Sequence, residues 1–280
     1  MFYYFGYGSN LSVPSLRAKG VDPLSSEPAI LDGWRLSFDL PDFFAIEGGT
    51  GNIQRSEPDA VHGVLHGCRN ADLARLDSLE AVGISYERIE GTVTTYSGKR
   101  ARAFVYVGLP SILDGQCLPS ERYKNILVRG ASDMRLDARY IDRLRALATC
   151  PLPEARPFAL GEGAEAPVVR VRMSLSELAS RRELTGFAGF VFDMSRARPR
   201  HAYLKQLLGG KDVTLLFLKR MDSSDGSEDF EDVRVGRYTE AQRRYLDAYL
   251  HEFAREYQLL GTLDYLASTD AEATGVLGAG

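Results

Sequence analysis

The first 150 residues alternate short apolar segments with turn residues, a pattern typical of β-strands rather than of long helices. The first segment is apolar and aromatic and stops abruptly at Gly6. Three other segments carry apolar residues at helical spacing. The predicted strands are 2–5, 35–39, 60–66, 88–96 and 102–107, and the predicted helices are 70–79, 119–128 and 137–148. Many strands with few helices favour an α+β fold, a mixed or antiparallel barrel with helices outside it.

A stretch rich in proline and glycine divides the chain at residues 151–168 and predicts a linker between two domains, 1–150 and 169–266. In the second domain, a capping box at Ser174 begins a short helix, and residues 186–193 form an apolar strand. A second capping box at Thr239 begins a long helix, which Gly261 ends. Residues 267–280 are small and polar, so we expect a flexible tail.

Composition indicates a soluble globular protein, with 44% apolar and 26% charged residues. The net charge of −4 argues against nucleic-acid binding, which needs a basic face. No apolar run is long enough to span a membrane and no leader is recognisable, so a cytoplasmic location is expected. The three cysteines are odd in number and widely spaced, which predicts neither a disulfide framework nor a CxxC metal site.

The loop Gly6–Asn10 is the first candidate site. Its two glycines allow the backbone to approach a ligand closely, and Ser9 and Asn10 can cap the following turn and leave N–H groups directed outward. A dinucleotide fingerprint fails, because Leu11 stands where the third glycine belongs. A nucleophile elbow fails as well, because Ser9 lacks flanking glycines two residues away on both sides. A tight turn after an edge strand is the remaining alternative.

Two further patterns are less informative alone. From spacing, Glu80 is a solvated glutamate at a helix end. His62 and His66 stand four residues apart, which suits a zinc pair on a helix. Their segment is predicted as a strand, where the two side chains would lie about 13 Å apart on one face. We therefore expect no metal site.

Four motifs in order, spanning residues 2–150, together resemble the γ-glutamylcyclotransferase family. They are Tyr7-Gly8-Ser9-Asn10, Gly51-Asn52-Ile53 ahead of Val61-His62-Gly63-Val64, Leu76-Asp77-x-x-Glu80 followed by Tyr86, and the helix Pro119–Ala131 with Tyr123. The resemblance implies a mixed β-barrel with outer helices.

It also implies an enzyme that cyclises the γ-glutamyl group of a small γ-glutamyl amine or amino acid, releasing 5-oxoproline and the free amine without a metal or cofactor. Glu80 would be the general acid/base, its pKa raised by burial. Main-chain N–H groups of the loop would bind the substrate carboxylate or the oxyanion. The implied substrate contacts are Tyr4, Phe5, Gly6, Tyr7, Gly8, Ser9, Asn10, Tyr86 and Tyr123. Residues 39–49 are expected to line the leaving-group side.

Residues 169–266 resemble the cytochrome b5-like fold, especially its membrane-associated progesterone receptor branch. The matching segments are Gly189–Ser195, Gly210–Thr214, Tyr238–Gln242 and Phe253–Tyr257. The chain departs from the bis-histidine pattern: Arg200-His201-Ala202-Tyr203 replaces His–Pro–Gly–Gly, and the second histidine is missing. Haem held through Tyr203 or His201 is one interpretation. The other is a haem-free module that packs on the catalytic domain, forms a homodimer or recruits a protein partner.

Two other functions stay open on the sequence alone. One is a haem-binding or small-ligand-binding protein whose cyclotransferase domain is inactive. The other is a γ-glutamyl deprotection enzyme of a biosynthetic pathway, which uses the same chemistry with a different leaving amine.

Overall fold

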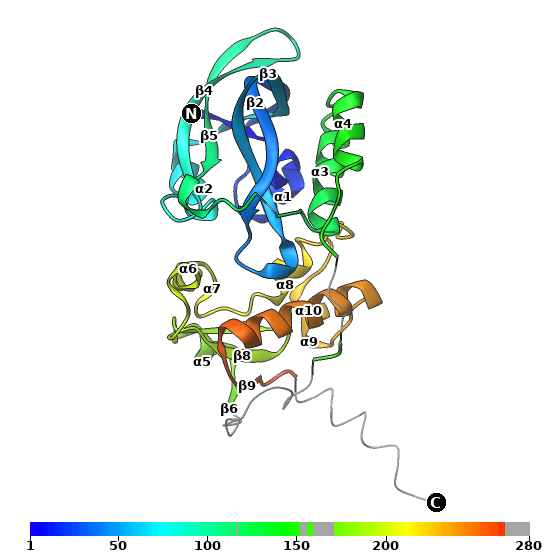
Figure 1. Cartoon of the computed structure of the whole chain (residues 1–280). Helices are drawn as coiled ribbons and strands as arrows, with labels where there is room; N and C mark the ends of the chain where they lie inside the picture. The colour runs from blue at the N-terminus through cyan, green and yellow to red at the C-terminus, as the bar shows by residue number, and fades with distance from the viewer. Residues whose placement is uncertain (116, 152–155, 159–170, 267–280) are drawn as a thin grey trace, which may run out of the picture. The chain divides into compact units, whose positions relative to one another are not determined.

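A closed five-stranded barrel, with strand order β1-β3-β2-β4-β5, forms the centre of the N-terminal half of the chain (Figure 1). Neighbouring strands are antiparallel except at the seam, where β1 runs parallel to β5 with Tyr4 opposite Phe104. The strands are β1 (Phe2–Gly6), β2 (Ser25–Pro41), β3 (Gly49–Cys68), β4 (Tyr86–Thr95) and β5 (Arg100–Gly108). The predicted mixed barrel is confirmed.

The computed structural model describes residues 1–115, 117–151, 156–158 and 171–266. They divide in the sequence into two compact units, which we call the barrel unit and the C-terminal unit. Most of the predicted linker 151–168, and the whole predicted tail 267–280, lie outside the described residues.

Strands β2 and β3 are much longer than predicted, at 17 and 20 residues. Their pairing shifts register at a bulge between Asp32 and Trp34, where Gly33 adopts a φ of 76°. Most of the β3 residues between Gln54 and Ala60 are polar and exposed. A strand with so little apolar alternation leaves no periodic signal in the sequence, which explains the shorter prediction.

The apolar residues of the barrel unit form clusters inside and outside the wall. The interior cluster includes Phe5, Leu31, Trp34 and Val105. On the outside, helices α3 (Glu121–Asp133) and α4 (Ala138–Arg145) contribute buried residues to a second cluster that includes Val64 of β3. The other helical segments are η1 (Ser9–Leu11), α1 (Val13–Ala18), η2 (Ala45–Glu47), η3 (Asn70–Asp72), α2 (Leu73–Leu79) and η4 (Pro110–Ile112). All three predicted helices are confirmed with small shifts at their ends.

The C-terminal unit is a four-stranded sheet of order β6-β9-β8-β7 with helices around it. Phe253 of the long helix α10 stacks on Phe187 of β7, with ring centroids 4.7 Å apart. The capping boxes at Ser174 and Thr239 are confirmed. None of the helices in the described ranges is long and apolar enough to cross a membrane. The elements are β6 (Val171–Met173), α5 (Leu175–Ala179), β7 (Leu184–Phe187), β8 (Phe190–Asp193), α6 (Pro199–Ala202), α7 (Lys205–Leu208), α8 (Thr214–Leu218), α9 (Phe230–Arg234), α10 (Glu240–Glu256) and β9 (Gln258–Leu263).

Two predictions for this unit are wrong. Residues 186–193 do not form one strand, because Ala188 and Gly189 both adopt positive φ (47° and 83°) and turn the chain into a hairpin. Gly261 does not end the long helix, which stops at Glu256, but lies inside β9. A Cβ at Gly261 would lie 1.9 Å from the Val171 carbonyl oxygen, so this glycine permits the pairing of β6 with β9.

The β7–β8 turn gives a test of backbone strain. Ala188→Gly should raise the free energy of unfolding by up to about 1 kcal/mol, because a non-glycine residue in the left-handed region is strained. The same change at Ala179, the last residue of helix α5, should lower it, since glycine disfavours a helix. Urea denaturation of both variants measures the two signs. A loss of stability in Ala188→Gly would contradict the strained turn.

Candidate active site

The side chain of Asn10 joins three polar groups at the end of strand β1. Its amide nitrogen donates to the Tyr4 hydroxyl and to Oε1 of Glu80, each at 2.8 Å. Its amide oxygen accepts a hydrogen bond from Nζ of Lys19 at 2.6 Å. Asn10 is only 4% exposed, so these contacts supply the hydrogen bonds that water would make to an exposed amide. The buried amide thus ties Glu80 to a loop 70 residues earlier in the chain.

The predicted capping role of Ser9 and Asn10 is wrong. Gly8 is the N-cap of η1 and makes no side-chain capping bond. Ser12 caps helix α1 instead, accepting the N–H of Ser15 at 3.2 Å. The Asn10 amide nitrogen bonds to Glu80 and Tyr4, and its oxygen accepts from Lys19.

Glu80 is the residue after helix α2 and is partly buried. Its Oε1 accepts from Asn10, whereas among the described residues no donor bonds to its Oε2. Burial raises the pKa of Glu80, and the Lys19 ammonium and the Asn10 hydrogen bond offset only part of that rise. The carbonyl end of α2 acts in the same direction as burial, because it disfavours a nearby negative charge. The predicted rise of this pKa is confirmed.

The chain turns sharply just after Glu80. Ala81 has a φ of 49°, in the left-handed region that side chains rarely adopt. Its carbonyl accepts the N–H groups of Ile84 and Ser85, at 2.9 and 2.8 Å. This turn leads directly from the carboxylate into β4, which begins at Tyr86. Strained backbone of this kind is concentrated at functional sites.

His66 supports the loop from behind as a neutral ring. It is fully buried, and its Nε2 lies 2.9 Å from the Asn10 carbonyl oxygen. Because a carbonyl only accepts, Nε2 carries the proton, and Nδ1 accepts from the Ser26 hydroxyl at 2.8 Å. Burial lowers the pKa of His66 to about 4. His62 bonds to the Tyr96 hydroxyl and stacks on the Tyr140 ring, so the two histidines have different partners.

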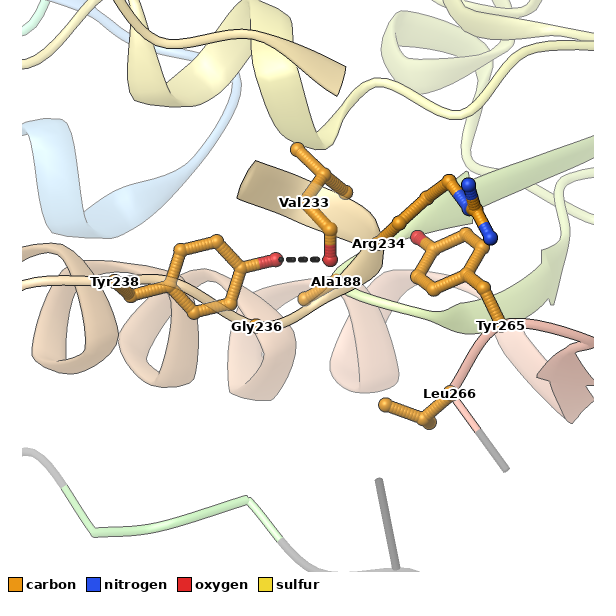
Figure 2. Close-up of a pocket in the computed structure, with 7 residues that line it drawn as sticks. All are labelled: Ala188, Val233, Arg234, Gly236, Tyr238, Tyr265 and Leu266. Atoms are coloured by element: carbon orange, nitrogen blue, oxygen red, sulfur yellow. Dashed lines mark hydrogen bonds between the residues drawn. The ribbon is translucent and has the colours of Figure 1, made fainter. Parts of the chain in front are cut away.

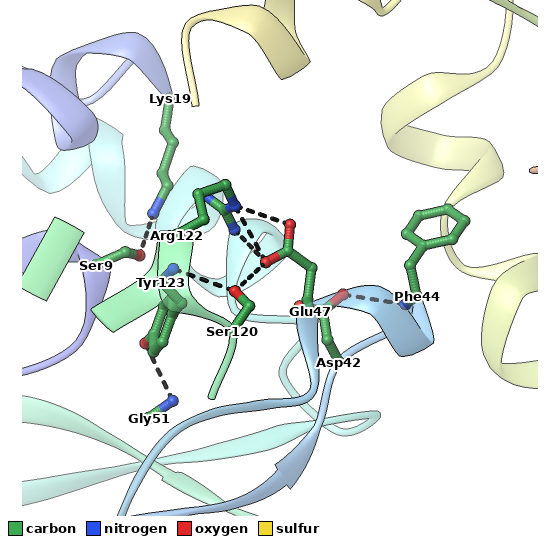
Figure 3. Close-up of polar contacts among 9 residues, drawn as sticks. All are labelled: Ser9, Lys19, Asp42, Phe44, Glu47, Gly51, Ser120, Arg122 and Tyr123. Atoms are coloured by element: carbon green, nitrogen blue, oxygen red, sulfur yellow. Dashed lines mark hydrogen bonds and ion pairs between the residues drawn. The ribbon is translucent and has the colours of Figure 1, made fainter. Parts of the chain in front are cut away.

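Two tyrosines meet at the main chain of Gly51. The Gly51 N–H donates to the Tyr123 hydroxyl at 3.0 Å (Figure 3). The Tyr86 hydroxyl donates to the Gly51 carbonyl at 2.7 Å. Burial raises the pKa of Tyr123 to about 12, so its hydroxyl stays protonated. Because its oxygen accepts the Gly51 N–H, the Tyr123 hydroxyl still has its own proton to donate.

Glycines on both sides make room for the Tyr123 hydroxyl. A Cβ on Gly8 would lie 2.8 Å from that oxygen, and a Cβ on Gly51 would lie 2.9 Å from it. Contacts this short would force the tyrosine to move. The sequence predicted that the loop backbone approaches a ligand closely. In the structure, the group that Gly8 approaches is the Tyr123 hydroxyl.

A buried ion pair anchors the helix that carries Tyr123. Arg122 Nη2 lies 2.6 Å from Oε2 of Glu47, and the Ser120 hydroxyl donates to the same oxygen at 2.9 Å (Figure 3). Both charged side chains are at most 10% exposed. The Ser120 N–H also donates to the Glu47 carbonyl at 3.1 Å. These contacts bind the β2–β3 connection to the first turn of α3.

The structure brings most predicted site residues together, but in two different ways. Tyr4, Asn10 and Glu80 share one hydrogen-bonded group, and Gly8, Tyr86 and Tyr123 surround Gly51. The Ser9 hydroxyl accepts from Lys19, which also bonds to Asn10. Phe5 and Tyr7 instead direct their side chains into the barrel core, and the Tyr7 hydroxyl bonds to the Tyr106 carbonyl at 2.5 Å. Any substrate contact of Phe5, Gly6 or Tyr7 would therefore be made by main-chain atoms.

Sequence reasoning missed Lys19, His66 and the pair of Glu47 and Arg122. Lys19 follows helix α1, whose N-terminus has a signal in the sequence, Ser12 followed by Pro14. That signal could have placed Lys19 one short helix away from the loop. For the pair of Glu47 and Arg122 no such signal exists, because the two residues lie 75 positions apart.

In the C-terminal unit, His201 does not fit an axial haem ligand in this arrangement. It is fully buried, its Nδ1 lies 3.0 Å from the Tyr257 hydroxyl, and its Nε2 lies 3.3 Å from Arg198. Both ring nitrogens are therefore engaged. Tyr203, the other predicted ligand, is partly buried just after α6.

A cavity of about 40 Å³ is present elsewhere in this unit, beside Tyr238 and Tyr265 (Figure 2). Ligand pockets usually measure at least about 300 Å³. Neither His201 nor Tyr203 lines this cavity, which has room for a water molecule rather than a haem.

Comparisons with known proteins identify relatives of half of the chain. The model of the AIG2-like family matches residues 60–144, which include Glu80, Tyr86 and Tyr123. The gamma-glutamylcyclotransferase of Homo sapiens is 30% identical over 152 residues, 52% of this chain and 78% of the relative. That of Mus musculus is 29% identical over 153 residues, with the same coverage. A solved structure of a gamma-glutamyl cyclotransferase is 28% identical and covers 53% of this chain and 89% of its own, with a TM-score of 0.48.

The buried pair of Glu47 and Arg122 gives a prediction for stability. Arg122→Met should cost about 3–5 kcal/mol in the free energy of unfolding, because Glu47 is left buried without its cation. The double variant Glu47→Met, Arg122→Met should lose clearly less, since no unpaired charge remains. Urea denaturation of the three proteins measures this order. A double variant less stable than Arg122→Met alone would contradict it.

Proposed function

Because the chain belongs to the γ-glutamylcyclotransferase family, we propose that its barrel unit cyclises the γ-glutamyl group of a γ-glutamyl amine or amino acid. The products are 5-oxoproline and the free amine. One observation carries this proposal: the Glu80 carboxylate has a raised pKa, one oxygen bonded to Asn10, and a second oxygen that no donor of the described residues contacts. Such a carboxylate can accept a proton and return it.

The proposed reaction balances within the substrate. The free α-amine of the glutamyl group attacks the γ-carbonyl carbon, and a new carbon–nitrogen bond closes a five-membered ring. Glu80 takes the proton that the attacking nitrogen loses and delivers it to the leaving nitrogen as the original amide bond breaks. No water, metal or electron acceptor enters this balance. Holding the amine against its own carbonyl supplies the proximity contribution.

We assign the oxyanion or the substrate carboxylate to the donors around Tyr123. Its hydroxyl accepts the Gly51 N–H and stays protonated, so it can donate to a substrate oxygen. Main-chain N–H groups of Tyr7, Gly8 and Ser9 are the further proposed donors. Such donors stabilise developing negative charge most where they are already oriented before the reaction.

The leaving amine is proposed to lie along residues 39–49. Three carboxylates of this segment already bond to protein groups: Asp39 to Asn52, Asp42 to the Phe44 N–H, and Glu47 to Arg122. The buried carboxylates of Asp39 and Glu47 are thus engaged within the fold. The segment favours selection by shape, and a panel of γ-glutamyl amides and γ-glutamyl amino acids assayed for 5-oxoproline would identify the preferred amine.

Glu80→Gln should reduce 5-oxoproline release by at least about 100-fold, because glutamine keeps the Asn10 contact but cannot accept the proton. In the unchanged protein, kcat/KM should fall as pH drops through the raised pKa of Glu80, since protonation removes the base. Release of 5-oxoproline from a proven substrate, measured across pH, tests both expectations. Full activity in Glu80→Gln would refute the role of Glu80.

The stability of Glu80→Gln is the control for folding. The folded pKa of Glu80 lies above its unfolded value, so its contribution to stability is present at low pH and is lost as pH rises through the folded pKa. Glutamine has no such titration. At neutral pH the variant should therefore unfold at the same or a higher temperature than the unchanged protein, and a lower value would indicate structural damage instead.

For the C-terminal unit we propose a haem-free module that binds a protein partner, a second copy of the chain or the catalytic domain. The engagement of both His201 ring nitrogens supports this choice over haem ligation. Purified protein supplied with haemin should show no Soret band beyond that of free haemin. A stoichiometric band that His201→Ala or Tyr203→Phe removes would restore the haem interpretation. The cytochrome b5-like resemblance and the cytoplasmic location stay predictions.

A further inference from the structure

Lys19 brings a positive charge to the loop from a neighbouring helix. It follows helix α1 directly and is partly buried. Its Nζ donates to the Ser9 hydroxyl at 2.9 Å (Figure 3) and to Oδ1 of Asn10 at 2.6 Å. Helix α1 thus delivers one ammonium group to two successive residues of the loop. The proposed function did not assign any role to this group.

The ammonium determines which way the Asn10 amide faces. An ammonium only donates hydrogen bonds, so the atom beside it must be the amide oxygen. The amide nitrogen then faces Tyr4 and Glu80, to which it donates. With the amide reversed, its oxygen would face the Glu80 carboxylate and its N–H groups would face the ammonium, so both contacts would be repulsive.

Lys19 is the charged group that acts on Glu80. Its ammonium lowers the pKa of Glu80 against the effect of burial. The other titratable groups coupled to Glu80 are phenols: Tyr4 and Tyr7 of β1, Tyr86 of β4, Tyr106 of β5 and Tyr123 of α3. Burial raises the pKa of each of these tyrosines, so they remain neutral where the carboxylate titrates.

We propose that Lys19 is a positioning residue for the proposed base: its ammonium orients the Asn10 amide toward Glu80 and places a positive charge one side chain away from the carboxylate. This inference rests on the proposed function, in which Glu80 must begin the reaction without its proton. Burial favours the protonated carboxyl, and in that form Glu80 cannot take a proton from the substrate amine.

The test compares Lys19→Met, Lys19→Gln and Lys19→Arg with the unchanged protein. In the unchanged protein kcat/KM falls at low pH as Glu80 is protonated, and we call this part of the pH profile the acidic limb. Lys19→Met should move the acidic limb to higher pH by about one unit, and so reduce kcat/KM about tenfold at a given pH on that limb. Lys19→Gln keeps a hydrogen-bond donor without the charge and should show the same shift. Lys19→Arg should return the limb to its original position. A limb that stays in place in Lys19→Gln would overturn the proposal.

Arg17 provides the matched control. It lies on the same helix α1, is exposed, and pairs with Asp22 at 2.6 Å. Arg17→Met removes one positive charge from the same helix without touching the loop, so the limb should not move. An equal shift in Arg17→Met would mean that overall charge, rather than the contact of Lys19, is responsible, and would overturn the proposal.

A direct titration separates this inference from the proposed function. The carboxyl carbon of Glu80, followed by ¹³C NMR with Glu80→Gln to assign it, reports its pKa without any turnover. This pKa should rise in Lys19→Met and Lys19→Gln and return in Lys19→Arg. If the unchanged protein releases no 5-oxoproline yet the titration shifts, the proposed function fails and the role of Lys19 stands. An unshifted titration would refute that role whatever the activity.

Discussion

One buried amide connects the parts of the barrel unit that the proposed chemistry needs. Asn10 bonds through its nitrogen to Tyr4 and Glu80 and through its oxygen to Lys19, while its main-chain carbonyl holds His66. These partners come from four different segments of the chain. An amide offers donors and an acceptor in one rigid group, so no other side chain of its size could make the same three contacts. The Asn10 amide therefore fixes the positions of the loop, the Glu80 carboxylate and the Lys19 ammonium relative to one another.

Two carboxylates of the barrel unit, Glu47 and Glu80, have opposite surroundings. Glu47 is neutralised by Arg122 and Ser120, and so fastens the β2–β3 connection to helix α3. Glu80 receives one neutral amide bond and a cation that contacts it only through Asn10. A fully paired carboxylate is a poor base, because its partners stabilise the charged form. The contrast separates a carboxylate that serves folding from one that is kept reactive.

Local patterns predicted the helices of the barrel unit and its strands β1, β4 and β5 well, but only short parts of β2 and β3. These patterns rest on hydrophobic periodicity and capping residues, which act over a few positions. They failed where a long-range contact decides. Gly261 resembled a helix terminus, yet it is a glycine because β6 packs against β9 at that point. Ala188 gave no turn signal, because its left-handed backbone departs from its preference. The motifs of the family identified Glu80, Asn10 and Tyr123, whereas Lys19 and Arg122 became visible only through their distances to other groups.

Strand β1 closes the barrel and also carries the loop. Its parallel seam with β5 has one registered pair, Tyr4 with Phe104, and the hydroxyl of this same Tyr4 accepts from Asn10. Local opening of the seam would therefore displace the partners of Glu80 at the same moment as it exposes the amides of β1. Hydrogen exchange of a few strand amides thereby becomes a measure of how long the reactive geometry persists, even in protein without substrate.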